Sequence, residues 1–169
     1  MIDRSGQVNR TAPLMPHAPH AASLKGFART GRLGPLALGM SRAEVRDALG
    51  PPMSWLAGKR VERSPLWKYG DAELYFDAAE KLEVIHFDWF EVPTGGPTLE
   101  LHPWVIRRGL PLPQLEAALR AEGIDFGGGR DRWNPECVRV VTAARVDFLV
   151  QVEGDADELG LWEFGCPAS

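Results

Sequence analysis

The sequence predicts an α+β fold in which two helices pack on one face of an antiparallel sheet. Two short segments carry apolar residues at helical spacing, and the runs that follow each of them alternate apolar and polar residues. This order occurs twice, which predicts two tandem helix-plus-sheet repeats, 34–92 and 98–166. Neither half has enough apolar residues for a good core, so we expect one domain over 34–169 with the two sheets joined edge to edge.

The first helix is predicted over 41–50. Ser41 and Glu44 have the spacing of a capping box, in which each side chain binds the backbone of the other residue. Gly50 and the two prolines after it end the helix. One apolar stripe at helical spacing would face the core: Val45, Ala48 and Leu49.

Three strands are predicted to follow, over 66–69, 72–76 and 82–90. Because side chains alternate between the faces of a strand, each run divides into a core side and a solvent side. In the third run we expect one set to point toward the core: Ile85, Phe87 and Trp89. The set on the other side is Val84, His86, Asp88 and Phe90.

The second half repeats this pattern. A strand is predicted over 99–106 and a helix from Pro113 to Gly123. The glycines at 127–129 indicate a flexible loop. Further strands are predicted over 137–142, 145–152 and 159–164, the last with Trp162 and Phe164 pointing inward.

Residues 1–33 have no periodicity and predict a disordered leader. They carry five basic residues against one acidic residue, so the leader is basic and the remainder of the chain, whose overall net charge is -4, is acidic. This balance argues against nucleic-acid binding. The start lacks the apolar core of a signal peptide, and no stretch is long and apolar enough to span a membrane. We therefore expect a cytoplasmic protein without membrane association, with Cys137 and Cys166 as reduced thiols.

Three segments together resemble the beta-lactamase-inhibitor-protein-like superfamily, which includes the outer-membrane lipoprotein domain of the SmpA/OmlA type. They are the helix motif GMSRAEVRDALGPP at 39–52, WKYGDAELYF at 67–76 and LEVIHF at 82–87. The resemblance implies a tandem helix-plus-sheet fold whose open sheet face grips another protein. The sequence also resembles small bacterial immunity proteins, although more loosely. This sequence departs from the lipoprotein branch, because no signal peptide and no lipobox cysteine follow its start.

The sequence favours a non-enzymatic protein-binding module, immunity or inhibitor-like, without a cofactor. No nucleophile or acid–base set has a recognisable spacing. A mixed aromatic and charged surface is typical of reversible protein interfaces, and tryptophans, of which the chain has six, anchor such interfaces. We expect Tyr75 and Trp104 to be hot spots. The predicted binding residues are Glu73, Tyr75, His86, Asp88, Phe90, Trp104, Arg145 and Asp147.

Two alternatives remain open. His86 and Asp88 lie two apart on one predicted strand face, so with His102 they could form a metal or small-molecule site. An ordinary polar pair on a sheet face explains the same residues. The third interpretation is a structural domain of an oligomer.

Overall fold

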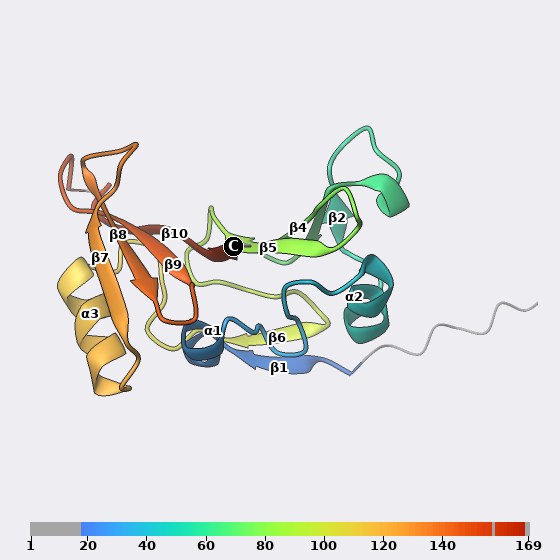
Figure 1. The fold of residues 1–169 in the computed structure, drawn as a ribbon, viewed down its shortest axis with the longest axis horizontal. Coiled ribbons are helices and arrows are strands. Elements are labelled where there is room, and N and C mark those ends of the chain that lie inside the picture. Colours follow the sequence, from blue (N-terminus) through green and yellow to red (C-terminus); the bar gives the residue numbers. More distant parts are fainter. Residues whose placement is uncertain (1–17, 157, 168–169) are drawn as a thin grey trace, which may run out of the picture.

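The computed structural model describes residues 18–156 and 158–167, which form a mixed α+β fold dominated by sheet (Figure 1). An eight-stranded antiparallel sheet has the strand order β2-β3-β4-β5-β10-β9-β8-β7. A second, parallel sheet pairs β1 (His20–Ser23) with β6 (Leu99–His102). The helices are α1 (Leu24–Thr30), α2 (Arg42–Leu49) and α3 (Leu112–Ala121), with a 3-10 turn η1 at Val61–Arg63. The large sheet comprises β2 (Ser54–Trp55), β3 (Leu66–Tyr69), β4 (Ala72–Phe76), β5 (Leu82–Phe87), β7 (Phe126–Arg130), β8 (Cys137–Thr142), β9 (Asp147–Gln151) and β10 (Gly160–Pro167).

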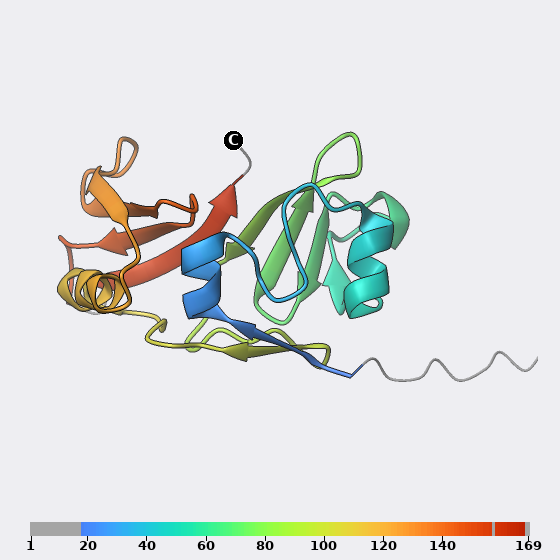
Figure 2. The ribbon, with the colours of Figure 1, turned by 60° about the horizontal axis from the view of Figure 1, so that its bottom comes forward.

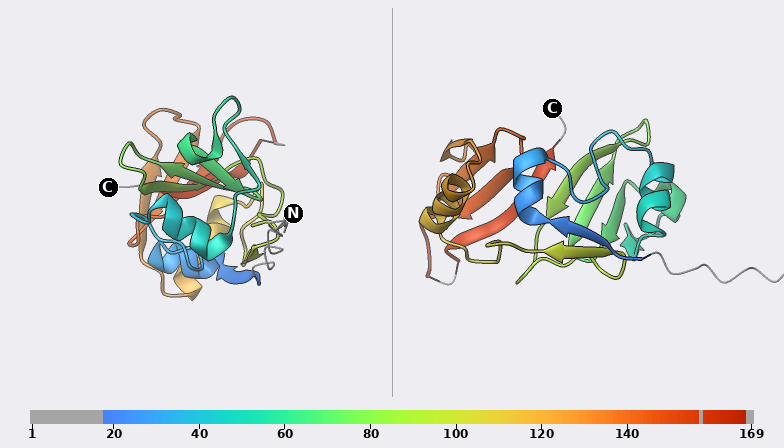
Figure 3. Two further views of the ribbon diagram at one scale, coloured as in Figure 1. Left: turned by 90° about the vertical axis from the view of Figure 1, so that its right-hand side faces the viewer. Right: turned by 90° about the horizontal axis from the view of Figure 1, so that it is seen from below.

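The three helices and the small parallel sheet lie on the same side of the large sheet, as Figures 1 and 2 show from two directions. The end-on view of Figure 3 shows α1 and α2 beneath the strands, with the short 3-10 turn η1 and loops above them. The helical side is where the apolar side chains gather, since Val45, Leu49, Leu115 and Leu119 are all buried. None of the three α-helices that the described residues form covers the opposite side of the sheet.

The pairing of β5 with β10 joins the strands of the first half to those of the second. Phe87 lies opposite Phe164, and the two rings stack with centroids 4.5 Å apart. Phe148 of β9 stacks on Phe164 at 5.8 Å. Aromatic rings bury large apolar areas, so this stack makes the junction part of the core rather than a seam between two cores.

Both predicted helices are present. The capping box of α2 forms as expected, with Glu44 N–H donating to Ser41 Oγ and Ser41 N–H donating to Glu44 Oε2. The helix ends at Gly50, whose φ of 75° favours glycine. Tyr69 then donates its hydroxyl to the Gly50 carbonyl at 2.8 Å, which fixes the end of α2 on β3.

The prediction of a disordered leader over 1–33 is wrong for its second part. Residues 20–30 form β1 and α1, and Leu24, Phe27 and Ala28 are buried. Ser23 caps the start of α1, and Gly31 ends it in the left-handed conformation. Phe27 packs edge-on against Phe87 and Phe164, so α1 covers the centre of the large sheet. Residues 1–17 lie outside the described part of the chain.

The strand predicted over 82–90 ends at Phe87, which overturns the orientation of its last residues. Trp89 takes a φ of 49° and is 81% exposed, whereas Phe90 is buried against Phe164 at 5.4 Å between ring centroids. A strand alternates faces only while its backbone stays extended, so the turn at Trp89 inverts the pattern. Trp162, predicted inward, is half-buried at a bulge of β10, with Arg108 over its ring.

The glycines at 127–129 do not form a flexible loop. They form β7, which pairs with β8 at the edge of the large sheet.

The strand predicted over 99–106 is shorter, as β6, and lies in the parallel sheet. In the described residues, no helix is long and apolar enough to cross a membrane.

Candidate functional site

A row of residues runs across the large sheet on the face turned away from the helices. The register pairs its members strand by strand: Lys68, Glu73, His86, Gly165, Asp147, Val141 and Gly127. Their neighbours along the strands, such as Leu74, Phe87 and Phe148, are buried on the helical side. We call this surface the open face. It holds two clusters of charged side chains.

The first cluster, which we call the Glu73 cluster, comprises Lys68, Glu73, Tyr75, His86, Asp88 and Glu163. Glu73 is its centre and is 7% exposed. Lys68 Nζ lies 2.7 Å from Glu73 Oε1, and the Tyr75 hydroxyl donates to Glu73 Oε2 at 2.6 Å. His86 Nδ1 lies 3.9 Å from the same Oε2. Lys68 therefore faces one oxygen of this carboxylate, and Tyr75 and His86 face the other.

The pKa values of Glu73 and Asp88, two of the three acids in the Glu73 cluster, shift in opposite directions. Burial opposes ionisation of Glu73, but the hydrogen bonds from Lys68 and Tyr75 outweigh it and hold the pKa of Glu73 below its ordinary value. Asp88 is different. Burial and the negative charge of Glu73 raise the pKa of Asp88, and no group among the described residues hydrogen-bonds to its buried Oδ1. An unpaired buried acceptor is energetically costly.

Gly165 explains how His86 reaches across the sheet. It lies directly opposite His86 on β10, where a side chain would clash. A Cβ at Gly165 would come within 2.6 Å of the Ile85 carbonyl and 3.2 Å of His86 Cδ2. Because that space is free, His86 Nε2 lies 3.8 Å from Glu163 Oε2 of β10.

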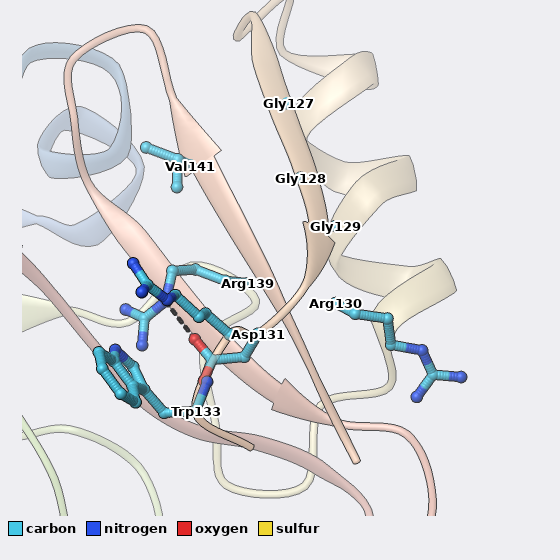
Figure 4. Close-up of a pocket in the computed structure, with 9 residues that line it drawn as sticks. Gly127, Gly128, Gly129, Arg130, Asp131, Trp133, Arg139 and Val141 are labelled. Atoms are coloured by element: carbon cyan, nitrogen blue, oxygen red, sulfur yellow. Dashed lines mark hydrogen bonds and ion pairs between the residues drawn. The ribbon is translucent and has the colours of Figure 1, made fainter. Parts of the chain in front are cut away.

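The second cluster joins Asp131, Arg139 and Asp147, of which Figure 4 shows Asp131 and Arg139. Arg139 donates through Nε to Asp131 Oδ2 at 2.8 Å and through Nη1 to Asp147 Oδ2 at 2.7 Å. Asp131 Oδ1 accepts the backbone N–H groups of Trp133 and Asn134, each at 2.9 Å. The hydrogen bond from Arg139 and these two amides lower the pKa of Asp131 to about 2. Asp131 therefore stays ionised and shapes the turn that carries Trp133.

A shallow hollow of about 540 Å³ lies beside the second cluster. It is lined by the backbone of 127–129, by Arg139 and Val141 of β8, and by the turn with Trp133. Figure 4 shows Arg130 pointing away from Arg139 and Asp131. Trp133 is 82% exposed, with the Arg132 guanidinium 5.0 Å from the centre of its ring.

The structure brings together half of the predicted binding residues. Glu73, Tyr75, His86 and Asp88 form one cluster, and Asp147 lies on the same face in the other. One prediction is wrong, because Phe90 is a buried core residue. Trp104 is half-buried after β6, and Arg145 is exposed in the turn before β9 at a φ of 64°, so their roles in binding stay predictions. His102 ends β6 in the other sheet, so the proposed trio with His86 and Asp88 does not form.

Sequence reasoning missed the two most exposed tryptophans, Trp89 and Trp133. Each adjoins one charge cluster, since Trp89 follows Asp88 and the Trp133 amide binds Asp131. A signal existed for Trp133, because Asp131 has the spacing of a side chain that caps a turn. Nothing local marks Trp89, whose exposure follows from a single left-handed residue. In Figure 1 the chain after β5 rises on the side away from the helices.

Comparison of the chain with protein-family models, with curated proteins and with solved structures finds no match. The likeness to the beta-lactamase-inhibitor-protein-like superfamily therefore rests on the sequence motif of residues 39–52 and the strands that follow it.

Proposed function

We propose that the protein is a non-enzymatic binding module that grips another protein on its open face. One observation carries this proposal: each charge cluster of that face is adjoined by a tryptophan more than 80% exposed, Trp89 at 81% and Trp133 at 82%. Large exposed aromatic side chains are costly in water and are enriched among the residues that dominate binding energy.

The charged side chains of the open face suit recognition because most of them are already held in place. Arg139 is fixed by two carboxylates, and Glu73 by Lys68 and Tyr75. A side chain that is ordered before binding loses less entropy on association. The tryptophans would then supply apolar contact area while the charges set orientation and exclude wrong partners. Binding would act by occluding a surface of the partner, as immunity and inhibitor proteins do.

We further propose that the two halves are tandem repeats of one helix-plus-sheet unit. Helix α2 precedes β2 to β5, and α3 precedes β7 to β10, so each half has a helix followed by four strands of the sheet. The last strand of each half forms the junction, β5 against β10. This arrangement supports membership of the superfamily named above, because the duplicated sheet offers one broad face.

The test starts by finding the partner. Immobilised protein is used to capture binding proteins from an extract of the source organism, and each candidate is purified and titrated by calorimetry. We expect Trp89→Ala and Trp133→Ala each to weaken the dissociation constant at least tenfold, because each removes an exposed anchor.

Trp55→Ala is the matched control. It makes the same substitution at a partly exposed tryptophan that lies opposite Trp67, on the helical side of β2. Affinity should stay within about twofold. If Trp55→Ala weakens binding while Trp89→Ala and Trp133→Ala do not, the partner binds another face and the proposal is wrong.

A further inference from the structure

We propose that Glu73, His86 and Asp88 form a binding site for a divalent transition-metal ion of the zinc type. These residues come from two neighbouring strands, β4 and β5, and from the first position after β5. They are the one group of potential metal ligands that the described residues bring together. The inference is independent of protein binding by the open face.

The geometry is close to that of a bound ion. One ligand atom from each residue lies within 4.8 Å of the others. Three atoms at such separations have a common point at most about 2.8 Å from each, whereas zinc lies about 2.0–2.2 Å from nitrogen and oxygen ligands. Each side chain would need to move by less than about 1 Å, which rotamer adjustments supply.

Asp88 is the residue that a cation would satisfy. Its Oδ1 is buried and accepts no hydrogen bond from the part of the chain that the structure describes, while the nearby carboxylate of Glu73 repels its charge. A divalent cation between the two acids would supply the missing partner and reverse the repulsion. Proteins rarely leave a buried acceptor unpaired without such a reason.

The surroundings of His86 fit a metal ligand. Its Nδ1 faces Glu73 at 3.9 Å, and its Nε2 faces the carboxylate of Glu163 at 3.8 Å. If Glu163 moved within hydrogen-bond distance, its carboxylate would hold the proton on Nε2 and leave Nδ1 free to bind metal. Glu163 is therefore a positioning residue rather than a ligand.

The ligand set selects the class of ion. One imidazole and two carboxylates suit zinc and its neighbours, whereas calcium takes six to eight oxygens and magnesium binds mainly through carboxylates and water. Lys68 opposes any cation, because its ammonium already pairs with Glu73. Removal of that charge should therefore strengthen metal binding.

The experiment titrates ZnCl2 into the chelator-treated full chain at pH 7.5 by calorimetry, with CaCl2 and MgCl2 as comparison ions. We expect one equivalent of zinc and no saturable binding of the other two. His86→Gln and Asp88→Asn should each weaken the zinc affinity at least 100-fold. Glu163→Gln should weaken it about 10-fold, because it loosens the imidazole. Lys68→Met should tighten it about 10-fold.

Two variants test for other zinc ligands. His20 and His102 are exposed histidines outside the cluster, so His20→Ala and His102→Ala should leave the affinity unchanged. Burial raises the pKa of the Cys137 and Cys166 thiols and disfavours the thiolate that zinc requires. Circular dichroism establishes that each variant is folded.

Zinc binding that survives in both His86→Gln and Asp88→Asn overturns the site. Absence of saturable zinc binding to the full chain overturns it as well. Neither result bears on protein binding, which is read from Trp89→Ala and Trp133→Ala. A decrease in affinity in Lys68→Met would also contradict the inference, since removal of a positive charge must favour a cation.

Discussion

At the scale of single residues, the open face depends on a glycine that has no side chain and on an aspartate that orders a turn. Gly165 leaves the space through which His86 reaches Glu163, and the carboxylate of Asp131 orders the turn that presents Trp133. Both act on the site through the backbone, so their substitution should change stability as well as binding.

Gly165→Ala should lower the free energy of unfolding by about 1–3 kcal/mol, because the added Cβ meets the backbone of β5 in a packed sheet. Gly129→Ala is the control, since a Cβ there meets nothing within 4 Å. Urea unfolding followed by circular dichroism measures both. Equal stability of the two variants would show that β10 can shift away from β5 without cost.

Asp131 should make stability depend on pH in the acid range. Its pKa is lowered to about 2 in the folded protein, against about 3.9 in an unfolded chain. A lowered pKa stabilises the folded state above the unfolded value, and the contribution disappears as pH falls through the folded value. The stability difference between the wild type and Asp131→Asn should therefore be constant from pH 7 to about 5 and shrink toward pH 2. A difference that grows on acidification would contradict this assignment.

At the scale of elements, the short helix α1 covers the junction between β5 and β10. It has only seven residues, too few for a stable isolated helix, so its stability comes from packing. Phe27 reaches both sides of the junction between β5 and β10. A segment that reads as a leader is therefore part of the core.

Phe27→Ala should lower the free energy of unfolding by about 3–5 kcal/mol, the usual cost of removing a buried phenylalanine ring. Arg32→Ala, an exposed position after the same helix, should change it by less than about 0.5 kcal/mol. Thermal and urea unfolding of both variants give the comparison. A small loss in Phe27→Ala would mean that α1 is dispensable for the fold.

At the scale of the whole molecule, the β5–β10 junction makes the two halves one cooperative unit. Phe164 contacts rings from α1, β5 and β9. We expect a single unfolding transition, with the same midpoint by tryptophan fluorescence and by far-ultraviolet circular dichroism. Phe164→Ala should lower both midpoints together. Two separated transitions would show that the halves fold independently.

The sequence by itself determined the local elements whose signals are local. The capping box at Ser41 and Glu44, the stop at Gly50 and the alternation in 72–76 and 82–87 depend on neighbours within a few residues, and all are present. Alternation also placed Glu73, Tyr75, His86 and Asp147 on one face, because a pleated strand permits no other arrangement while it stays extended.

Only the tertiary structure decided the rest. Leu24 and Phe27 become core residues because the aromatic junction of a sheet formed far along the chain needs a cover. Trp89 is exposed because its backbone turns left-handed after β5, and Glu73 replaces His102 beside Asp88 because β4 pairs with β5 while β6 leaves the sheet. Residues that pair or pack with each other are distant in sequence. The free energy of these contacts therefore produces no local sequence pattern.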